Sequence, residues 1–152
     1  MDVYTNMSEK QFEELMHEQI PITKEMGFSV EEFKPWQVRM GAKLEPNLIT
    51  SANAFGGSIN SLMTVCGWAL VFSNIMSLDP DVQVALQKSS IEYIKPVGTD
   101  FFAKCEMINN EKRDRFFKTY KQLGKARLEV HVLIKDREEV LARFRGLYVV
   151  FK

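Results

Sequence analysis

The sequence predicts an α+β fold in which a curved antiparallel sheet of about six strands wraps around one long helix. The first observation is that the segment from Pro46 to Leu78 contains no Asp, Glu, Lys, Arg or His. The second is that strand-like segments occur on both sides of it, two before and four after. A flat two-layer packing would leave one side of an uncharged helix in water, so the sheet has to curl around that helix.

Length and charge restrict the class of protein. The chain has 152 residues, which fits one domain, so we expect a single domain over 1–152 whose residues 1–20 form an N-terminal helix and its lead-in. Twenty basic residues balance twenty acidic ones. Because the net charge is zero, no overall field attracts nucleic acid or anionic lipid, and we expect neither as a partner.

Cysteine usage and the start of the sequence indicate the compartment. Cys66 and Cys105 are the two cysteines, and such a pair provides neither a disulfide framework nor a four-ligand zinc site. The start MDVYTNMSEK has no cationic stretch followed by an apolar one. We therefore expect a cytoplasmic protein.

The elements before the uncharged segment have clear signals. Ser8 followed by Gln11 forms a capping-box pattern that predicts a helix over 8–19. Two strands follow, over 26–34 and 36–44, with Pro35 as the break between them.

The uncharged segment divides into a polar loop and a helix. Asn47, Thr50, Ser51 and Asn53 make its first part a loop, and 58–77 is apolar almost all round, which predicts a buried helix. A membrane span over 59–76 is the alternative. Polar residues such as Asn60 and Thr64 interrupt that stretch, so we expect no membrane partner.

The second half of the chain predicts four strands. Residues 82–94 and 98–108 are strand-like and are joined by Lys95-Pro96-Val97-Gly98, so we expect a hairpin. The charged stretch 109–121 is interpreted as a loop. Alternating apolar residues predict strands over 126–135 and 140–151, joined by a short turn at 136–138.

Several motifs then point to a known family. They are Glu45-Pro46-Asn47, Phe55-Gly56-Gly57-Ser58, Thr64-Val65-Cys66-Gly67-Trp68, Ile91-Glu92-Tyr93-Ile94-Lys95-Pro96-Val97 and Gly146-Leu147-Tyr148-Val149. In this order and spacing they resemble the hotdog-fold thioesterases of the YiiD C-terminal type, over residues 20–151.

The resemblance implies a hotdog fold that pairs with a second copy, so that sites form at the subunit interface of a homodimer. Further assembly into a dimer of dimers is left open. Hotdog enzymes hydrolyse or dehydrate acyl thioesters, so the implied partner is a small acyl thioester of coenzyme A or an acyl carrier protein. Neither a metal nor a separate cofactor is implied, since coenzyme A is part of the substrate.

Gly57 is the first candidate for the reaction. A glycine pair at the start of a long helix presents free N–H groups and the positive end of the helix dipole, and a thioester oxygen can accept from them. The N–H of Gly57 would stabilise the oxyanion. The alternative is that the pair only lets loop and helix pass closely. Phe55, Gly56 and Ser58 flank Gly57 and are predicted to contact the substrate.

The chain departs from the resembled enzymes in its polar groups. Phe55 stands where many of them have a His, and Thr64 stands where they often have an Asp or Glu. Thr64 can orient a water but cannot act as the base at neutral pH. In the loop, Ile49 replaces a second Asn, while Asn47 and Asn53 remain as amides for a carbonyl or a water. Their alternative role is to bond their own backbone.

Two further groups are candidates for binding. Lys88, Ser89 and Ser90 precede an apolar part of the strand expected to pair across the dimer, and either face the partner's site or form an ordinary solvent face. The densest basic run is Lys112, Arg113, Arg115, Lys118, Lys121, Lys125 and Arg127. It is either a flexible clamp for coenzyme A phosphates or a solvated loop.

Three functions remain open at this point. The favoured one is acyl thioester hydrolysis, with Gly57 polarising the carbonyl and Asn47, Asn53 and Thr64 positioning water. The second is a non-catalytic acyl-thioester binding or scaffold protein, because the His and the helix carboxylate are missing. The third is an acyl dehydratase, for which His131 alone is a poor start.

Overall fold

The computed structural model describes residues 6–50 and 52–152; the start MDVYT and Ser51 of the predicted loop lie outside the described residues. In chain order the elements are α1 (Glu9–Gln19), α2 (Ile22–Glu25), β1 (Phe28–Lys34), β2 (Gln37–Ala42), the short 3-10 helix Glu45–Asn47, β3 (Leu48–Ile49), β4 (Asn53–Ala54), α3 (Gly56–Ile75), β5 (Gln83–Tyr93), β6 (Phe101–Glu106), α4 (Asn110–Leu123), β7 (Lys125–Asp136) and β8 (Glu139–Phe151).

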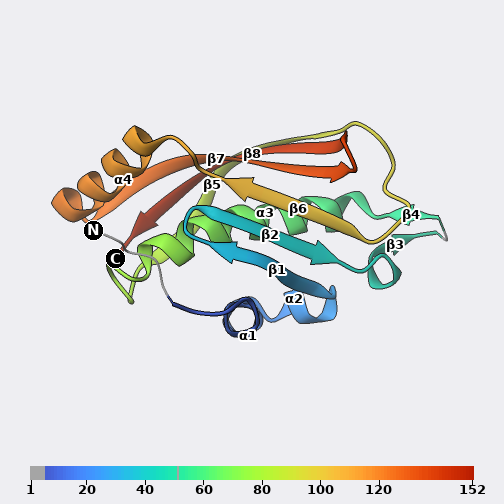
Figure 1. Ribbon diagram of the computed structural model, residues 1–152, viewed down its shortest axis with the longest axis horizontal. Helices are drawn as coiled ribbons and strands as arrows, with labels where there is room; N and C mark the ends of the chain where they lie inside the picture. Colours follow the sequence, from blue (N-terminus) through green and yellow to red (C-terminus); the bar gives the residue numbers. More distant parts are fainter. Residues whose placement is uncertain (1–5, 51) are drawn as a thin grey trace.

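A six-stranded antiparallel sheet forms one layer of the molecule, with strand order β1-β2-β6-β7-β8-β5. The sheet curves around α3, which contacts β2, β5, β6, β7 and β8. Figure 1 shows α3 running along the sheet, with α4 at one end of the molecule and the small β3–β4 pair at the other. The predicted α+β fold with a wrapped central helix is confirmed.

Helix α3 is the centre of the core because it is apolar on nearly every side. Its buried residues include Leu62, Met63, Leu70, Val71 and Ile75. Among the described residues it is the one helix long and apolar enough to cross a membrane, and 78% of its apolar window is buried inside the protein. The sheet therefore supplies the apolar surroundings that the lack of charge requires.

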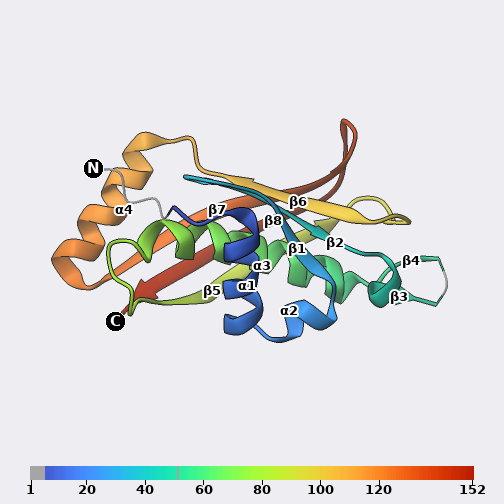
Figure 2. The ribbon, with the colours of Figure 1, turned by 60° about the horizontal axis from the view of Figure 1, so that its bottom comes forward.

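Helix α1 covers the β1 side of the sheet. Ser8 and Gln11 form the predicted capping box, which satisfies N–H groups at the start of the helix. Phe12 stacks on Phe33 of β1, with ring centroids 4.3 Å apart. The carboxylate of Glu13 accepts from the Val30 N–H at 2.8 Å, so α1 also bonds to this outer strand. Figure 2 shows α1 lying across β1 and α3.

Two predictions are wrong. Strands β5 and β6 form no hairpin: β5 pairs with β8 at one edge, whereas β6 lies between β2 and β7. The Pro and Gly of the 95–98 connection mark a crossover that leads from the outer strand β5 past β8 and β7 to the interior strand β6. The charged stretch is also not a loop, because Asn109 caps α4 through a bond to the Lys112 N–H, and Gly124 ends it in the left-handed conformation.

Candidate functional site

The start of α3 presents main-chain donors. Phe55 is the N-cap, and its carbonyl oxygen accepts from the N–H groups of Ser58 and Ile59. In the described part of the chain, the N–H groups of Gly56 and Gly57 have no hydrogen-bond partner. Gly57 is exposed and Gly56 is half-buried. Two free donors therefore lie at the positive end of a 20-residue helix dipole.

Two aromatic rings flank these donors. A Cβ at Gly57 would lie 2.4 Å from the Phe55 ring, and one at Gly56 would lie 3.6 Å from the Tyr93 ring. The Tyr93 hydroxyl donates to the Gly56 carbonyl oxygen at 3.0 Å. Both rings remain about half exposed, at 51% for Phe55 and 52% for Tyr93. The glycine pair thus lets two apolar rings approach the backbone while leaving the donors open.

One face of α3 stays accessible along part of the helix. Every residue of α3 that is not fully buried lies on it: Gly56, Gly57, Asn60, Ser61, Thr64 and Trp68. Their spacing of three to four residues forms a strip that runs from the free donors to Trp68. From Ala69 to Ile75 the helix is buried, so the strip ends at Trp68, whose ring stacks on Phe72 at 4.9 Å. We call these six residues the α3 strip.

Thr64 lies in the middle of the α3 strip. Its hydroxyl is 3.5 Å from Oδ1 of Asn60, one turn away, and it is half-buried. Its carbonyl oxygen accepts from the buried Tyr148 hydroxyl on the opposite side. Within the described chain no titratable side chain hydrogen-bonds the Thr64 hydroxyl or the Gly57 N–H, so this strip supplies donors and acceptors rather than a base.

The two loop asparagines lie in different environments. Asn47 is 2% exposed, and its Nδ2 donates to the carbonyl oxygens of Met26 at 2.7 Å and Lys43 at 2.6 Å. Its side chain therefore links the segment before β1 to the segment after β2 through two backbone carbonyl oxygens. This is the alternative role considered for Asn47, in which the amide bonds backbone and not a substrate or water. Asn53, in β4, is half-buried and lies beside Gly98.

The polar residues of β5 divide between the two faces of the sheet. Ser89 pairs with the buried Gly146, whereas Lys88 and Ser90 pair with Leu147 and Arg145. Directly opposed residues point to the same face. Ser89 therefore shares the face that contacts α3, and Lys88 and Ser90 point outward. A shift in register between Leu86 and Lys88 reverses which residues of β5 face α3. After the shift it is Ser89, and not Lys88 or Ser90, that faces the helix.

Other chemically active side chains lie away from the strip. Cys66 and Cys105 are buried and unpaired, and burial raises the pKa of both thiols. His131 is exposed on β7, 3.8 Å from Glu129. In the described ranges no cluster of His, Cys, Asp and Glu is suited to holding a metal ion.

The basic run lies largely on helix α4 rather than on a flexible loop. Arg113 donates to the Met107 carbonyl oxygen and lies over the Trp36 ring at 5.4 Å. Arg127, on β7, donates to Gln87 of β5 at 2.9 Å. These two cations are fixed in position by protein contacts.

Two features of this region were not predicted from the sequence. The motif that contains Tyr93 gives no indication of its contact with Gly56, because that contact depends on β5 passing the start of α3. Trp68 was likewise not expected to end an accessible strip. Helical spacing from Gly57 through Thr64 to Trp68 is the signal that indicates a common face.

Known proteins share this fold. A family model described as "Putative thioesterase (yiiD_Cterm)" matches residues 9–152. A protein of unknown function from Chlorobaculum tepidum TLS is 24% identical, with a TM-score of 0.87 over 95% of this chain and 94% of that one. A protein from Shewanella oneidensis described as a "putative thioesterase" is 26% identical, with a TM-score of 0.81 over 95% and 97%. A Haemophilus influenzae thioesterase, 14% identical, has a TM-score of 0.74 over 100% and 96%.

The fold is therefore the hotdog fold, and the class is that of thioesterase-like hotdog proteins. The chain belongs to the YiiD C-terminal thioesterase family.

Proposed function

We propose that the protein hydrolyses an acyl thioester of coenzyme A or of an acyl carrier protein at the α3 strip. The observation that carries this proposal is the pair of free N–H groups at Gly56 and Gly57, at the positive end of α3 and between two apolar rings. Such donors match the place where negative charge develops in acyl transfer.

In this mechanism the thioester carbonyl oxygen accepts from the Gly57 N–H. Water attacks the carbonyl carbon, the oxygen becomes negative in the tetrahedral intermediate, and the helix dipole stabilises it. Collapse of the intermediate breaks the C–S bond and releases a carboxylic acid and a thiol. Thr64 and Asn60 can hold the attacking water through hydroxyl and amide groups. The base that takes the proton has to come from outside the strip.

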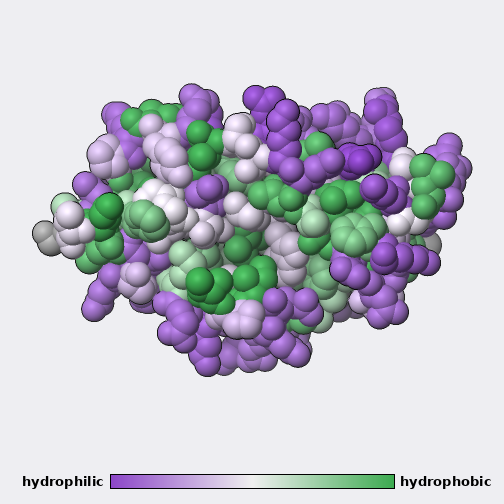
Figure 3. Space-filling model, turned by 180° about the vertical axis from the view of Figure 1, so that it is seen from behind, coloured by the Kyte–Doolittle hydropathy of each residue, from purple (hydrophilic) through white to green (hydrophobic). Residues whose placement is uncertain are grey.

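The acyl chain would run along the α3 strip. Gly57 and Trp68 are eleven residues apart, which is about 16 Å along a helix axis. Apolar rings border the start of this path, namely the exposed Phe55 and Tyr93. Figure 3, which views the protein from behind, shows apolar groups spread over this face between hydrophilic margins. The path suits an acyl chain of medium length.

We infer that the working form is a homodimer joined through β5. Strand β5 is an outer strand of the sheet, and nine of its eleven residues are exposed, with Val84 and Ile91 as the half-buried ones. An exposed outer strand of this length is a template for another strand. Pairing of two β5 strands would bring a second copy beside the α3 strip. Two unpaired cysteines accord with a cytoplasmic location, which we also propose.

The direct test is hydrolysis of a panel of acyl-coenzyme A esters from acetyl to palmitoyl, followed through the released thiol. Turnover with an optimum at intermediate length supports the proposal. No turnover with any coenzyme A ester or with an acyl carrier protein thioester contradicts it.

A second function, non-catalytic binding of an acyl thioester, is favoured by one observation. In the described chain no titratable group hydrogen-bonds the Gly57 N–H or the Thr64 hydroxyl. Under this alternative, acyl-coenzyme A raises the melting temperature in proportion to ligand concentration, and no thiol is released. The same panel therefore separates the two functions.

A further inference from the structure

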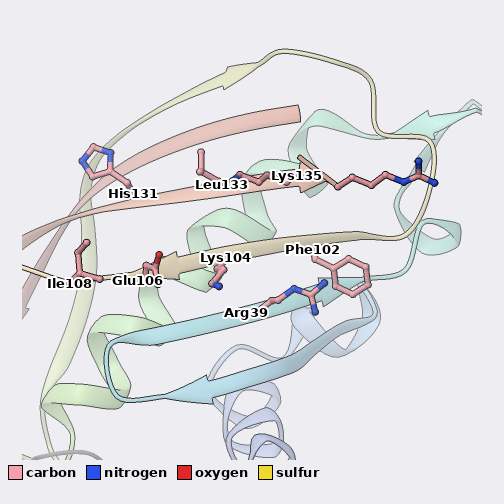
Figure 4. A pocket seen from close by; sticks show the side chains of 9 residues that line it. Arg39, Phe102, Lys104, Glu106, Ile108, His131, Leu133 and Lys135 are labelled. Carbon is pink, nitrogen blue, oxygen red and sulfur yellow. The ribbon is translucent and has the colours of Figure 1, made fainter. Parts of the chain in front are cut away.

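The outer face of the sheet carries a groove that the proposed thioesterase chemistry does not use. It has a volume of about 670 Å³ and runs across β2, β6 and β7, on the side of the sheet that faces away from α3. Figure 4 shows its side chains projecting from these three strands. The lining residues that carry the argument are Arg39, Phe102, Lys104, Leu133, Lys135 and Arg137. We call this the outer groove.

The outer groove concentrates positive charge. Four of its lining residues are Lys or Arg, against the single carboxylate of Glu106. Within the described residues, no carboxylate lies within 4.0 Å of a nitrogen of these four side chains. The whole chain has a net charge of zero. The positive field is therefore local to this groove.

The register of the sheet places like charges side by side. Arg39 of β2 is directly opposite Lys104 of β6 on one side and Glu32 of β1 on the other, with no ion pair to Glu32 within 4.0 Å. Lys104 is opposite Leu133 of β7. Like charges in directly opposed positions destabilise a sheet. A bound anion would relieve this repulsion, because it gives both cations a common partner.

An aromatic ring orients one of these cations. The Arg39 guanidinium lies over the Phe102 ring, 4.3 Å from its centroid. The ring has room because residue 41, directly opposite Phe102, is a glycine, where a Cβ would lie 2.9 Å from the ring. A guanidinium positioned over an aromatic ring keeps its N–H groups available for a phosphate group. Figure 4 shows Arg39 and Phe102 together at one end of the groove.

The charge distribution disfavours a second copy of the chain as the occupant. A two-fold contact places the same patch on both partners, so four cations would face four cations with one carboxylate on each side. The volume lies within the range of small-molecule sites, about 300–1,000 Å³. Phe102 and Leu133 add apolar surface beside the cations.

We propose that the outer groove binds a small polyanion in which a phosphate chain is joined to an aromatic or apolar group, as in a nucleoside triphosphate. Arg39 and Lys104 hold the phosphates, while Phe102 and Leu133 contact the aromatic part. This site is separate from the α3 strip, so the proposal does not rest on thioester hydrolysis.

The experiment is isothermal titration of the full chain with three probes, without magnesium and at low salt. ATP carries both parts of the ligand, pyrophosphate only the phosphates, and adenosine only the aromatic part. We expect ATP to bind more tightly than pyrophosphate, adenosine to bind weakly, and ATP affinity to fall as salt is added.

Matched variants locate the binding. Arg39→Gln with Lys104→Gln should weaken ATP about tenfold or more, since charge-assisted bonds are lost. The control, Lys10→Gln with Lys118→Gln, removes two exposed cations from α1 and α4 and should leave the affinity unchanged. Phe102→Ala should weaken ATP more than pyrophosphate, because pyrophosphate loses only the orientation of Arg39, whereas ATP also loses the contact with the ring. An unchanged or higher melting temperature shows that the groove variants remain folded.

The results that overturn the proposal are equally specific. Absence of binding by both ATP and pyrophosphate removes the phosphate site. Equal losses in the two double variants show general charge attraction instead of a site. Pyrophosphate as tight as ATP, with Phe102→Ala without effect, removes the aromatic part. Binding of poly-glutamate but not of ATP contradicts a small-molecule ligand.

Discussion

The hydroxyl of Tyr148, on β8, donates to the main-chain carbonyl oxygen of Thr64, in the middle of α3, at 2.6 Å. The hydroxyl reaches the helix backbone because residue 67 is a glycine, where a Cβ would lie 2.5 Å from the Tyr148 oxygen. This contact fixes the helical turn that carries Thr64 and Trp68, two residues of the α3 strip.

Tyr148→Phe removes this link while keeping the ring. We expect a loss of about 1–2 kcal/mol in the free energy of unfolding, because the substitution removes a buried hydrogen-bond donor and leaves its acceptor in place. Urea denaturation at neutral pH measures it. Tyr93→Phe, which removes an exposed hydroxyl bond to Gly56, serves as the control and should cost less. Equal losses in the two variants would contradict the special role of the Tyr148 contact.

Alkaline pH should weaken the fold through its buried tyrosines. Burial, and then the bond to the Asp79 carboxylate, raise the pKa of Tyr120 to about 12, and burial also raises the pKa of Tyr148. A folded-state pKa above the unfolded value means that the stabilisation is complete below about pH 10 and is lost as pH rises from there. The free energy of unfolding should therefore fall between about pH 10 and 12.

The variant Tyr120→Phe tests the cause of this alkaline loss. Its free energy of unfolding should decline less steeply above pH 10 than that of the parent protein, because one raised tyrosine pKa is removed. Identical slopes for the parent and Tyr120→Phe would exclude a contribution from Tyr120.

Charge on the outer strand should prevent pairing of two copies. Leu86 is a 38% exposed apolar residue of β5, and Leu86→Lys adds a cation to the strand proposed to pair with its counterpart. We expect the parent protein to be a dimer and Leu86→Lys to shift it toward monomer, measured by light scattering after size exclusion. Leu123→Lys, at the end of α4, is the matched control and should remain dimeric. A monomeric parent protein would contradict the proposed assembly.

Trp68 should limit the length of the acyl chain. Because the α3 strip ends at its ring, Trp68→Ala opens space toward Phe72, and kcat/KM should shift toward longer acyl-coenzyme A esters. Trp68→Phe keeps an aromatic ring there and should retain the parent preference. Melting temperatures check that loss of the stacking on Phe72 leaves the variant folded. An unchanged chain-length profile in Trp68→Ala would place the end of the acyl path elsewhere.

The fold could be predicted because its strongest signals are visible within short segments of the sequence. The uncharged segment required a buried helix, and the capping box at Ser8 marked the start of α1. The pairing of β5 was missed because Pro96 and Gly98 favour a tight turn, whereas the strand's partner, β8, lies about fifty residues away in the sequence. Helix α4 was not predicted because its many charged residues favoured a solvated loop. Its helical signals are the Asn109 N-cap and two buried aromatic residues, Phe116 and Tyr120, four positions apart.

The site was predictable only in part. Glycines at the start of an uncharged helix indicate free donors, and the structure has them. The loop asparagines were ambiguous because an amide bonds a ligand or a backbone carbonyl equally well, and only the fold shows that Asn47 bonds two carbonyls. The outer groove had no signal in the sequence, since Arg39 and Lys104 become neighbours only through strand pairing.

The most direct test of the central claim compares Gly57→Ala with Gly57→Pro in thioester hydrolysis. Both variants add the same Cβ against the Phe55 ring, which is half exposed and free to shift. Only proline removes the N–H, and it is tolerated in the first turn of a helix. With both variants folded by melting temperature, we expect Gly57→Ala to retain most of the activity. Gly57→Pro should lose about 100-fold in kcat, the usual cost of one oxyanion donor. Equal activity in the two variants would show that the Gly57 N–H does not stabilise the oxyanion.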